Sequence, residues 1–469
     1  MFPFILAFLA IYNPQHWRSY PSMDEVRCIT TSPSRLYIAV PNGVYILRRS
    51  TYRHIRTLTR ADGIAEPVRL CAYNPLRGDL FITTENHIYQ FLATTAVLSE
   101  LNPPFKHIYS IGIGPDGAYF DTETGIFHKH KIAQQFTKTR SIPVKITWYG
   151  RRDTAKPRDY IFLVPYYFTD EQLINHPMNL VFPDNRTRRL YVAAQDYGIT
   201  VYNLSTGLPE HRICLGPSSE SVRRITNLEG RLWFTAPNHT TTLDPDGNWS
   251  HFRTRFGDLP GTGFRLLFTN LLDLERRENI NAVLGESSNA YLGTDKGLYL
   301  LGPKGKLTQI LDIGLPVNGL TRIGDSLLLG TDAGLFALAG ESLFELQDPF
   351  DRTGFGVYSI ARTATGLTYF GTFGGMLSLD STGHWEQIIP PGFDLSKPVY
   401  GLTAAGNIVF YDNGSGITAY DAQNRTWNTI GRTDGLPSDT ITALYADQRY
   451  LWITSAGLIT RLDYKAELK

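Results

Sequence analysis

One motif recurs along this chain about every 40 residues, the length of one four-stranded blade of a β-propeller. It reads apolar, aromatic, apolar, small, Thr, two spacers, then Gly and an apolar residue. Clear copies begin at Leu36, Ala118, Ala290, Leu327, Thr368 and Leu451, and weaker copies at Leu80, Leu190, Leu232 and Ile408. The sequence therefore predicts an all-β fold, a β-propeller of about ten four-stranded blades.

Each copy of the motif predicts a hairpin. An apolar run forms one strand, and the turn with its glycine lets the chain return as the next. A further strand is expected upstream, as at 441–446, and an outer strand downstream, marked by Trp249, Phe344, Trp385 and Trp427. Small residues such as Gly293, Gly330 and Gly371 are expected where neighbouring blades converge and space is scarce.

The two ends of the chain complement each other. The last repeat stops near Leu462 after three strands, and the chain begins with an unmatched strand at His16–Tyr20. Pairing that strand into the last blade would close the propeller and remove exposed strand edges. Two arrangements remain open: a single large ring, or two smaller rings with the closing strand crossing between them.

Charge and cysteine content exclude several classes of function. The chain has 45 basic and 44 acidic side chains, a net charge of +1, so no general field attracts nucleic acid or an anionic membrane. Polyanion binding would need a local patch. Cys28, Cys71 and Cys214 are far apart and predict neither a disulfide framework nor a metal knuckle. We expect no cofactor and no metal; His128 and His130 lie on one face of a strand, but no third ligand is near.

Residues 1–12 contain an uncharged apolar stretch that is too short to span a bilayer but matches the core of a signal peptide. This predicts export to the periplasm or cell surface, with the propeller occupying 13–469. The alternative is an additional N-terminal strand. No later segment has the length of a membrane-spanning helix, so we expect no transmembrane anchor.

Two insertions interrupt the repeat, at about 142–184 and 257–279. Insertions in repeat arrays form loops on one face, where binding is often found. The first combines arginines with aromatic residues, which suits contact with a protein or glycan. Its candidate binding residues are Trp148, Tyr149, Arg151, Arg152, Arg158, Tyr166 and Tyr167. The alternative is that the aromatic residues pack on a neighbouring blade. Leucines at helical spacing in the second predict a helix that covers a blade.

The C-terminal repeat permits a comparison with a known family. The run from Asp434 to Asp447, continued by Leu451–Thr454 and Gly457–Leu458, resembles the two-component regulator propeller repeat. That resemblance implies an extracytoplasmic propeller of the kind found in bacterial hybrid sensor kinases and in envelope and secretion machinery. Unlike the sensors, this sequence carries no membrane helix, immunoglobulin-like stalk or kinase, so we expect a stand-alone exported protein.

The expected function is binding of a protein or glycan ligand, as a sensor-like or scaffolding component of a bacterial envelope system. We expect that the protein is not an enzyme, because the sequence contains no catalytic motif. The alternative is a propeller-type lyase that acts on a polysaccharide or a cyclic peptide. A lyase would need a histidine with Arg, Tyr or carboxylate groups around one channel mouth.

Overall fold

The computed structural model describes residues 13, 15–131, 135–153, 155–170, 173–228, 230–236, 239–253, 274, 278–286, 289–302, 306–389, 394 and 397–468. The predicted leader at 1–12 lies outside these ranges. So does most of the second insertion, and with it the predicted helix. Of that insertion only Leu274, Glu278 and Asn279 are described, and Leu274 is buried beside Ile280 and Leu292.

Ten antiparallel sheets make up the described chain, as the repeat predicted. Eight of them have the predicted four strands, and two have a fifth. Each of the ten copies begins on the second of the four regular strands of its blade and continues through the turn into the third. Four of the copies share one hydrogen bond at the turn. The Thr hydroxyl that ends the second strand donates to the carbonyl of the turn glycine, at 2.9 Å from Thr331 to Gly334 and 2.6 Å from Thr122 to Gly125, and likewise from Thr294 to Gly297 and from Thr372 to Gly375. Gly334 and Gly125 have positive φ, 137° and 123°, which other residues rarely adopt.

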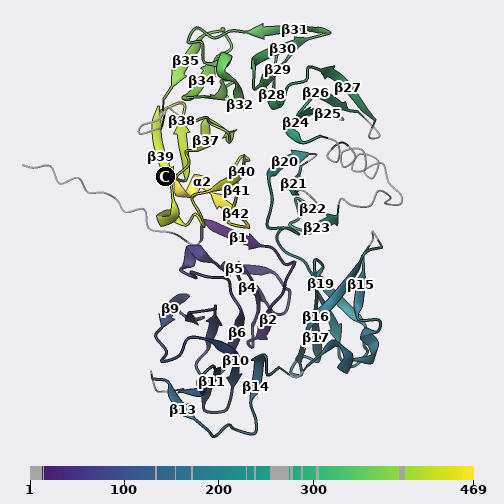
Figure 1. Cartoon of the computed structure of the whole chain (residues 1–469), viewed down its shortest axis with the longest axis vertical. Coiled ribbons are helices and arrows are strands. Elements are labelled where there is room, and N and C mark those ends of the chain that lie inside the picture. Colours follow the sequence, from purple (N-terminus) through teal and green to yellow (C-terminus); the bar gives the residue numbers. More distant parts are fainter. Residues whose placement is uncertain are drawn as a thin grey trace, which may run out of the picture.

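Blades 1 to 4 form one ring, in the lower half of Figure 1. Blade 1 contains β2 (Cys28–Thr31), β3 (Arg35–Val40), β4 (Gly43–Arg48) and β5 (His54–Leu58). Blade 2 contains β6 (Leu70–Asn74), β7 (Asp79–Thr83), β8 (Ile88–Leu92) and β9 (Val97–Leu101). Blade 3 contains β10 (Ile108–Ile113), β11 (Gly117–Thr122), β12 (Gly125–His130), β13 (Thr137–Thr139) and β14 (Thr147–Gly150). Blade 4 contains β15 (Tyr167–Thr169), β16 (Asn175–Asp184), β17 (Arg189–Ala194), β18 (Gly198–Asn203) and β19 (Pro209–Ile213).

Contacts between blades close this four-blade ring. Strand β2 contacts β6 and β16, and β6 contacts β10. Between blades 3 and 4, the ring of Tyr149 on β14 stacks on Phe182 of β16 with centroids 6.1 Å apart. Blades 1 and 4 are also joined by a buried ion pair between Arg49 and Asp184.

Blades 5 to 10 form the second ring. Blade 5 contains β20 (Arg224–Leu228), β21 (Arg231–Ala236), β22 (His239–Leu243) and β23 (Trp249–Arg253). Blade 6 contains β24 (Ile280–Glu286), β25 (Asn289–Thr294), β26 (Gly297–Leu301) and β27 (Leu307–Asp312). Blade 7 contains β28 (Val317–Ile323), β29 (Ser326–Thr331), β30 (Gly334–Ala339) and β31 (Ser342–Leu346). Blade 8 contains β32 (Val357–Arg362), β33 (Thr368–Thr372), β34 (Gly375–Leu379) and β35 (Trp385–Ile388). Blade 9 contains β36 (Leu402–Ala405), β37 (Ile408–Asp412), β38 (Ile417–Asp421) and β39 (Thr426–Ile430). Blade 10 contains β40 (Ile441–Ala446), β41 (Tyr450–Ser455), β42 (Leu458–Asp463) and β1 (Trp17–Pro21).

The first strands of these six blades, β20, β24, β28, β32, β36 and β40, contact one another in a closed circuit. Of the two arrangements left open by the sequence, the structure therefore has two rings, and both fall within the usual range of about four to eight blades. In the described part of the chain, short helices occupy connections between strands: η1 (Arg60–Asp62), η2 (Pro157–Asp159), η3 (Ile161–Leu163), η5 (Thr353–Phe355) and η6 (Arg432–Asp434). The short helix α2 (Tyr464–Glu467) follows the last strand.

The closing strand was predicted correctly, and it also links the rings. Strand β1 pairs with β42 in the six-blade ring, and residues 22–27 then lead into blade 1 of the four-blade ring. The chain returns through 214–223. The two crossings lie side by side at the junction of the rings, since a Cβ on Gly216 would lie 2.3 Å from the Pro21 carbonyl oxygen. Blade 1 contacts both: Asn42 donates to Glu220 at 2.6 Å, and the Tyr45 hydroxyl donates to the Pro21 carbonyl at 2.5 Å.

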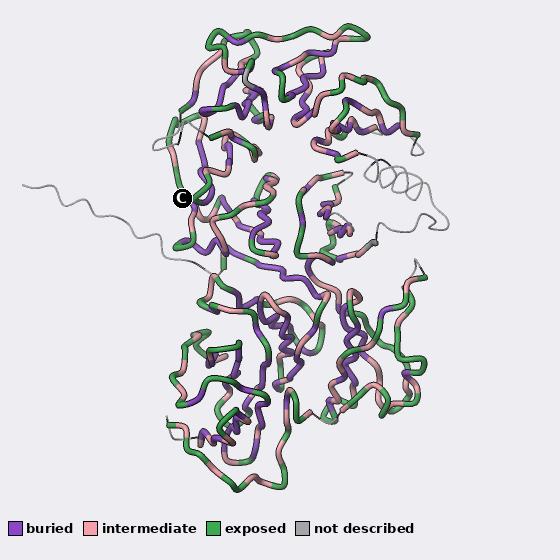
Figure 2. Tube along the Cα trace, in the orientation of Figure 1, coloured by how far each residue is buried: buried purple, intermediate pink, exposed green. Residues whose placement is uncertain are grey.

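Burial follows the position of each strand in its blade. Inner and middle strands are mostly buried, whereas outer strands such as β9, β19, β31 and β39 are largely exposed (Figure 2). One apolar cluster crosses the junction and includes Tyr20, Tyr191, Phe234 and Trp452. The rings therefore share a core where they meet.

Candidate functional site

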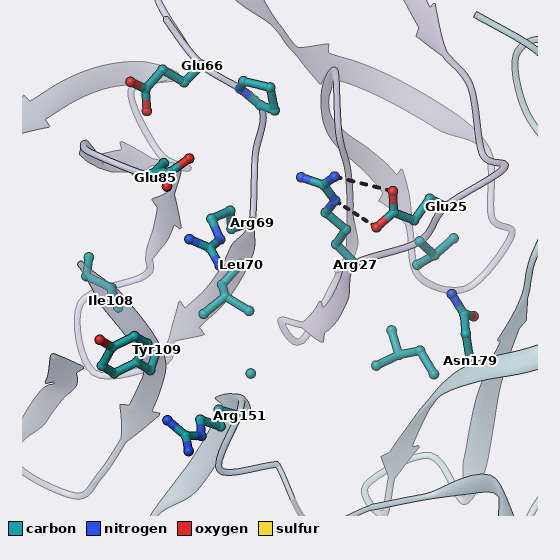
Figure 3. Close-up of a pocket in the computed structure, with 14 residues that line it drawn as sticks. Glu25, Arg27, Glu66, Arg69, Leu70, Glu85, Ile108, Tyr109, Arg151 and Asn179 are labelled. Atoms are coloured by element: carbon teal, nitrogen blue, oxygen red, sulfur yellow. Dashed lines mark hydrogen bonds and ion pairs between the residues drawn. The ribbon is translucent and has the colours of Figure 1, made fainter. Parts of the chain in front are cut away.

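A polar opening lies at the axis of the four-blade ring, with a volume of about 950 Å³. Its lining includes the residues at which the chain enters the first strands of blades 1, 2 and 3, together with residues of β14 and β16. Figure 3 shows Arg69, Tyr109 and Arg151 along one side and the pair Glu25–Arg27 on the other. We call this the axial opening.

Two of its acidic side chains are already engaged. Glu25 accepts from the guanidinium of Arg27 at 3.1 and 3.3 Å, and Arg27 also donates to the Val68 carbonyl at 2.8 Å. Glu66 accepts from the Asn86 amide and backbone at 2.7 and 3.0 Å. These hydrogen bonds, the Asn86 side chain first, lower the pKa of Glu66, so it is ionised at neutral pH.

Two arginines of the opening lack such partners. Within the described ranges, the guanidinium groups of Arg69 and Arg151 make no ion pair with a carboxylate, and both residues are exposed. Arg151 lies over the Tyr109 ring, 5.8 Å from its centroid, and Tyr109 is 39% exposed. Free guanidinium groups beside an exposed phenol can bind carboxylates, phosphates or the hydroxyls of a sugar.

Of the predicted binding residues, Arg151 is the one that lines this opening. Tyr149 precedes it on β14 but points into the core, with 7% of its surface exposed. Its hydroxyl accepts a hydrogen bond from Thr30 at 3.0 Å, and burial raises its pKa well above the ordinary value. Tyr149 therefore contributes packing between blades, the alternative that the sequence left open.

Trp148 and Arg152 form a separate pair on the surface of blade 3. The guanidinium of Arg152 lies 5.0 Å from the Trp148 ring centroid, and it donates to Asp121 at 2.7 and 3.2 Å. This arginine is held by its neighbours, although part of its side chain remains exposed.

Arg158 and Tyr166 lie on the segment that leads into blade 4, and Tyr167 begins its first strand, β15. Arg158 is exposed on η2, and Tyr166 and Tyr167 are each 38% exposed. None of the three lines the axial opening. The structure thus distributes the predicted residues over four locations, and their role in binding stays a prediction.

Reasoning from the sequence missed the residues that precede the first strands of blades 1 and 2. Glu25-Val26-Arg27 precedes β2, and Glu66-Pro67-Val68-Arg69 precedes β6, so an acid followed by an arginine occupies the same place in two successive repeats. Comparing equivalent positions between blades, rather than only the insertions, would have found this signal.

The six-blade ring has an axial channel of its own, about 740 Å³ in volume. Three of the four asparagines that line it are paired within their blades: Asn279 and Asn281 donate to Asp295 at 2.6 and 2.9 Å, and Asn318 donates to Asp332 at 2.7 Å. No histidine is among the described residues that line either opening. Within the same residues, no group of three or more His, Cys, Asp or Glu side chains could hold a metal ion.

The described part of the chain contains no helix that is long and apolar enough to cross a membrane. No protein-family model matches the sequence, and no curated protein matches it.

Solved structures with similar folds were found. The extracellular domain of one hybrid two-component system of B. thetaiotaomicron is 14% identical with a TM-score of 0.40, over 95% of this chain and 62% of that domain. A second such domain from the same organism is 12% identical with a TM-score of 0.37, over 93% of this chain and 75% of that domain. The virginiamycin B lyase of Staphylococcus aureus is 11% identical with a TM-score of 0.37, over 63% of this chain and 97% of the lyase.

This chain therefore spans less than two thirds of the first of these domains. Extracellular domains of two-component systems are the class that the repeat motif resembles. At these identities the likeness concerns the fold alone.

Proposed function

We propose that this chain is an exported β-propeller that binds a protein or glycan ligand at the axial opening of its four-blade ring. It would act as a sensor-like or scaffolding component of a bacterial envelope system. The observation that carries the proposal is the pair of guanidinium groups without a carboxylate partner among the described residues, Arg69 and Arg151, on neighbouring blades at one open, polar hollow. The apolar leader supports export.

Binding rather than catalysis is the better account of this site. The lyase alternative requires a histidine beside Arg, Tyr or carboxylate groups, and the described lining of the axial opening supplies all of these except the histidine. A ligand held here would be recognised by charge and hydrogen bonds.

Capture of a ligand tests the proposal. The full chain is immobilised and exposed to a detergent extract of the source envelope and to a glycan array. The double variant Arg69→Ala/Arg151→Ala should lose about tenfold or more in affinity, because two charged contacts are removed. Its thermal midpoint should stay unchanged, since both side chains are exposed and unpaired.

The matched control is Arg140→Ala/Arg432→Ala, which removes two other exposed arginines away from both openings. It should bind as the original chain does. Undiminished binding by the folded Arg69/Arg151 variant would refute the site. Recovery of the protein from the cytosol with Met1 intact, rather than from periplasm or surface with a mature N-terminus near residues 11–14, would refute export.

A further inference from the structure

A second hollow of about 660 Å³ lies between blades 1 and 4. It is lined by the turn that follows β2 and by Thr187, which follows β16. The axial opening is instead lined by residues before β2 and in the first half of β16. The two hollows therefore lie toward opposite faces of the four-blade ring.

Arginine dominates this second hollow. Arg35, Arg48, Arg49 and Arg189 line it, and its described lining contains no carboxylate. We call these four residues the arginine groove. Outside the lining, Asp184 pairs with Arg49, and Glu210 accepts from Arg189 at 3.1 Å. Arg35 and Arg48 have no carboxylate partner among the described residues, which leaves two positive charges uncompensated. This is the local basic patch that the near-neutral composition does not reveal.

The uncompensated arginines are forced together by the sheet. Arg35 on β3 is the direct cross-strand partner of Arg48 on β4. Like charges directly opposite each other destabilise an antiparallel pair. An anion bound between them would remove that repulsion.

Arg49 has one unsatisfied hydrogen-bond donor beside the groove. Its side chain is 6% exposed, and it donates to the Ser32 carbonyl at 2.9 Å and to Asp184. The buried Nε–H has no hydrogen-bond partner in the structure. An unsatisfied buried donor is costly, and here it belongs to a residue that lines the groove.

We propose that the arginine groove binds a phosphate group as its dianion, either free or as a monoester. Two uncompensated arginines match the charge of about −1.5 to −2 that a phosphate monoester carries at neutral pH. Its three or four oxygens can accept from several guanidinium groups at once, whereas a carboxylate offers two. Ser50 adds a hydroxyl group at the rim, whereas the Thr187 hydroxyl donates to Asp184 at 2.7 Å. Ile55 is the one exposed large apolar residue in the described lining, so an acyl chain finds little surface there.

Thermal unfolding and calorimetry of the full chain test this site. Inorganic phosphate and glucose 6-phosphate are added at matched ionic strength, with glucuronate and sodium chloride as controls. The phosphate compounds should raise the unfolding midpoint, because a ligand that binds only the folded state stabilises it. Glucuronate, a sugar with a carboxylate, should bind about tenfold or more weakly. The tighter of the two phosphate compounds shows whether the free ion or an ester is the natural form.

Arg35→Gln/Arg48→Gln is the informative variant. Without phosphate its unfolding midpoint should equal or exceed that of the original chain, since the repulsion is gone. It should lose the stabilisation by phosphate, while Arg69→Ala/Arg151→Ala should keep it, because the axial opening is a different site. Equal binding of glucuronate, or unchanged phosphate binding by the folded Arg35/Arg48 variant, would overturn the assignment.

Discussion

Trp17 lies directly opposite Leu462, at the start of an antiparallel register that runs to Pro21 opposite Leu458. Strand β1 is thus the fourth strand of the last blade. It is also the point where the chain leaves the six-blade ring for the four-blade ring. Tyr20 on this strand is 6% exposed, and its ring lies 5.2 Å from that of Trp249 in blade 5.

Removal of β1 should destabilise the protein. A chain that starts at Ser22 loses the buried Trp17 and Tyr20 and exposes the edge of β42. We expect the free energy of unfolding to fall by about 3 kcal/mol or more, since each large side chain contributes about 1.5–3 kcal/mol. A chain that starts at Asn13 is the control and should match the original. Equal denaturant midpoints for the two truncations would contradict closure by β1.

Tyr149 and Arg151 should behave differently although they are neighbours on and after β14. Tyr149→Ala removes a buried ring between blades and should cost about 3–5 kcal/mol. Tyr149→Phe loses only the hydrogen bond that Thr30 donates, so the free energy of unfolding should fall by about 1 kcal/mol. Arg151→Ala should leave stability unchanged and weaken ligand capture. Urea unfolding of the three variants checks this, and a stable Tyr149→Ala variant would show that the ring does not pack as described.

Gly293 should not tolerate a side chain. A Cβ there would lie 2.6 Å from the Val317 carbonyl oxygen and 2.8 Å from Val317 Cγ1, in the first strand of the next blade. Gly293→Ala should therefore cost about 1–3 kcal/mol by overpacking. Gly302→Ala in the same blade is the control, because its nearest neighbour would be 3.6 Å away. Similar unfolding midpoints for both variants would argue against close blade convergence at Gly293.

Two partly buried histidines at the junction of the rings should make stability depend on pH. Burial lowers the pKa of His54 to about 3 and that of His251 to about 4. The unfolded chain binds these protons near pH 6.5, and the folded chain does not. Stability should therefore decrease as pH falls from about 6.5 toward 4, by up to about 1.4 kcal/mol per pH unit for each histidine.

Nearby carboxyls act in the opposite direction. Burial raises the pKa of Asp24 and Glu220, so their protonation favours the folded state as pH falls. Comparing the original chain with the variant His251→Gln isolates the contribution of one histidine. The His251 imidazole lies 2.9 Å from the Gly216 carbonyl oxygen, and the glutamine amide can take its place there. The stability difference should shrink or reverse between pH 6.5 and pH 5. A difference that is constant with pH would disprove the role of His251.

The blades were predictable because their signals are local. Alternating apolar residues and a turn glycine mark each second strand, as in β29 and β41, regardless of the rest of the chain. The division into two rings was not predictable, because it depends on which blades pack together, as Arg49 of blade 1 does with Asp184 of blade 4.

The site was predicted only in part for the same reason. Arg151 was found because an insertion interrupts the repeat. Tyr149 was selected with it, but β14 pairs with β10 as an additional strand of blade 3, and nothing in the local sequence signals that pairing. Arg69 stands on a regular repeat, where only a comparison with Arg27, the residue before the first strand of blade 1, distinguishes it from other exposed arginines.

Hydrogen–deuterium exchange of the full chain, with and without the ligand captured from the envelope, tests the proposed site most directly. The lining of the axial opening comes from segments far apart in sequence: 25–27, 66–70, 108–109, 150–151 and 179–180. Bound ligand should slow exchange in peptides that cover these segments together, because they surround one opening. Slower exchange confined to the segment at 155–168 that leads into and begins blade 4, or to the channel of the six-blade ring, would contradict the account.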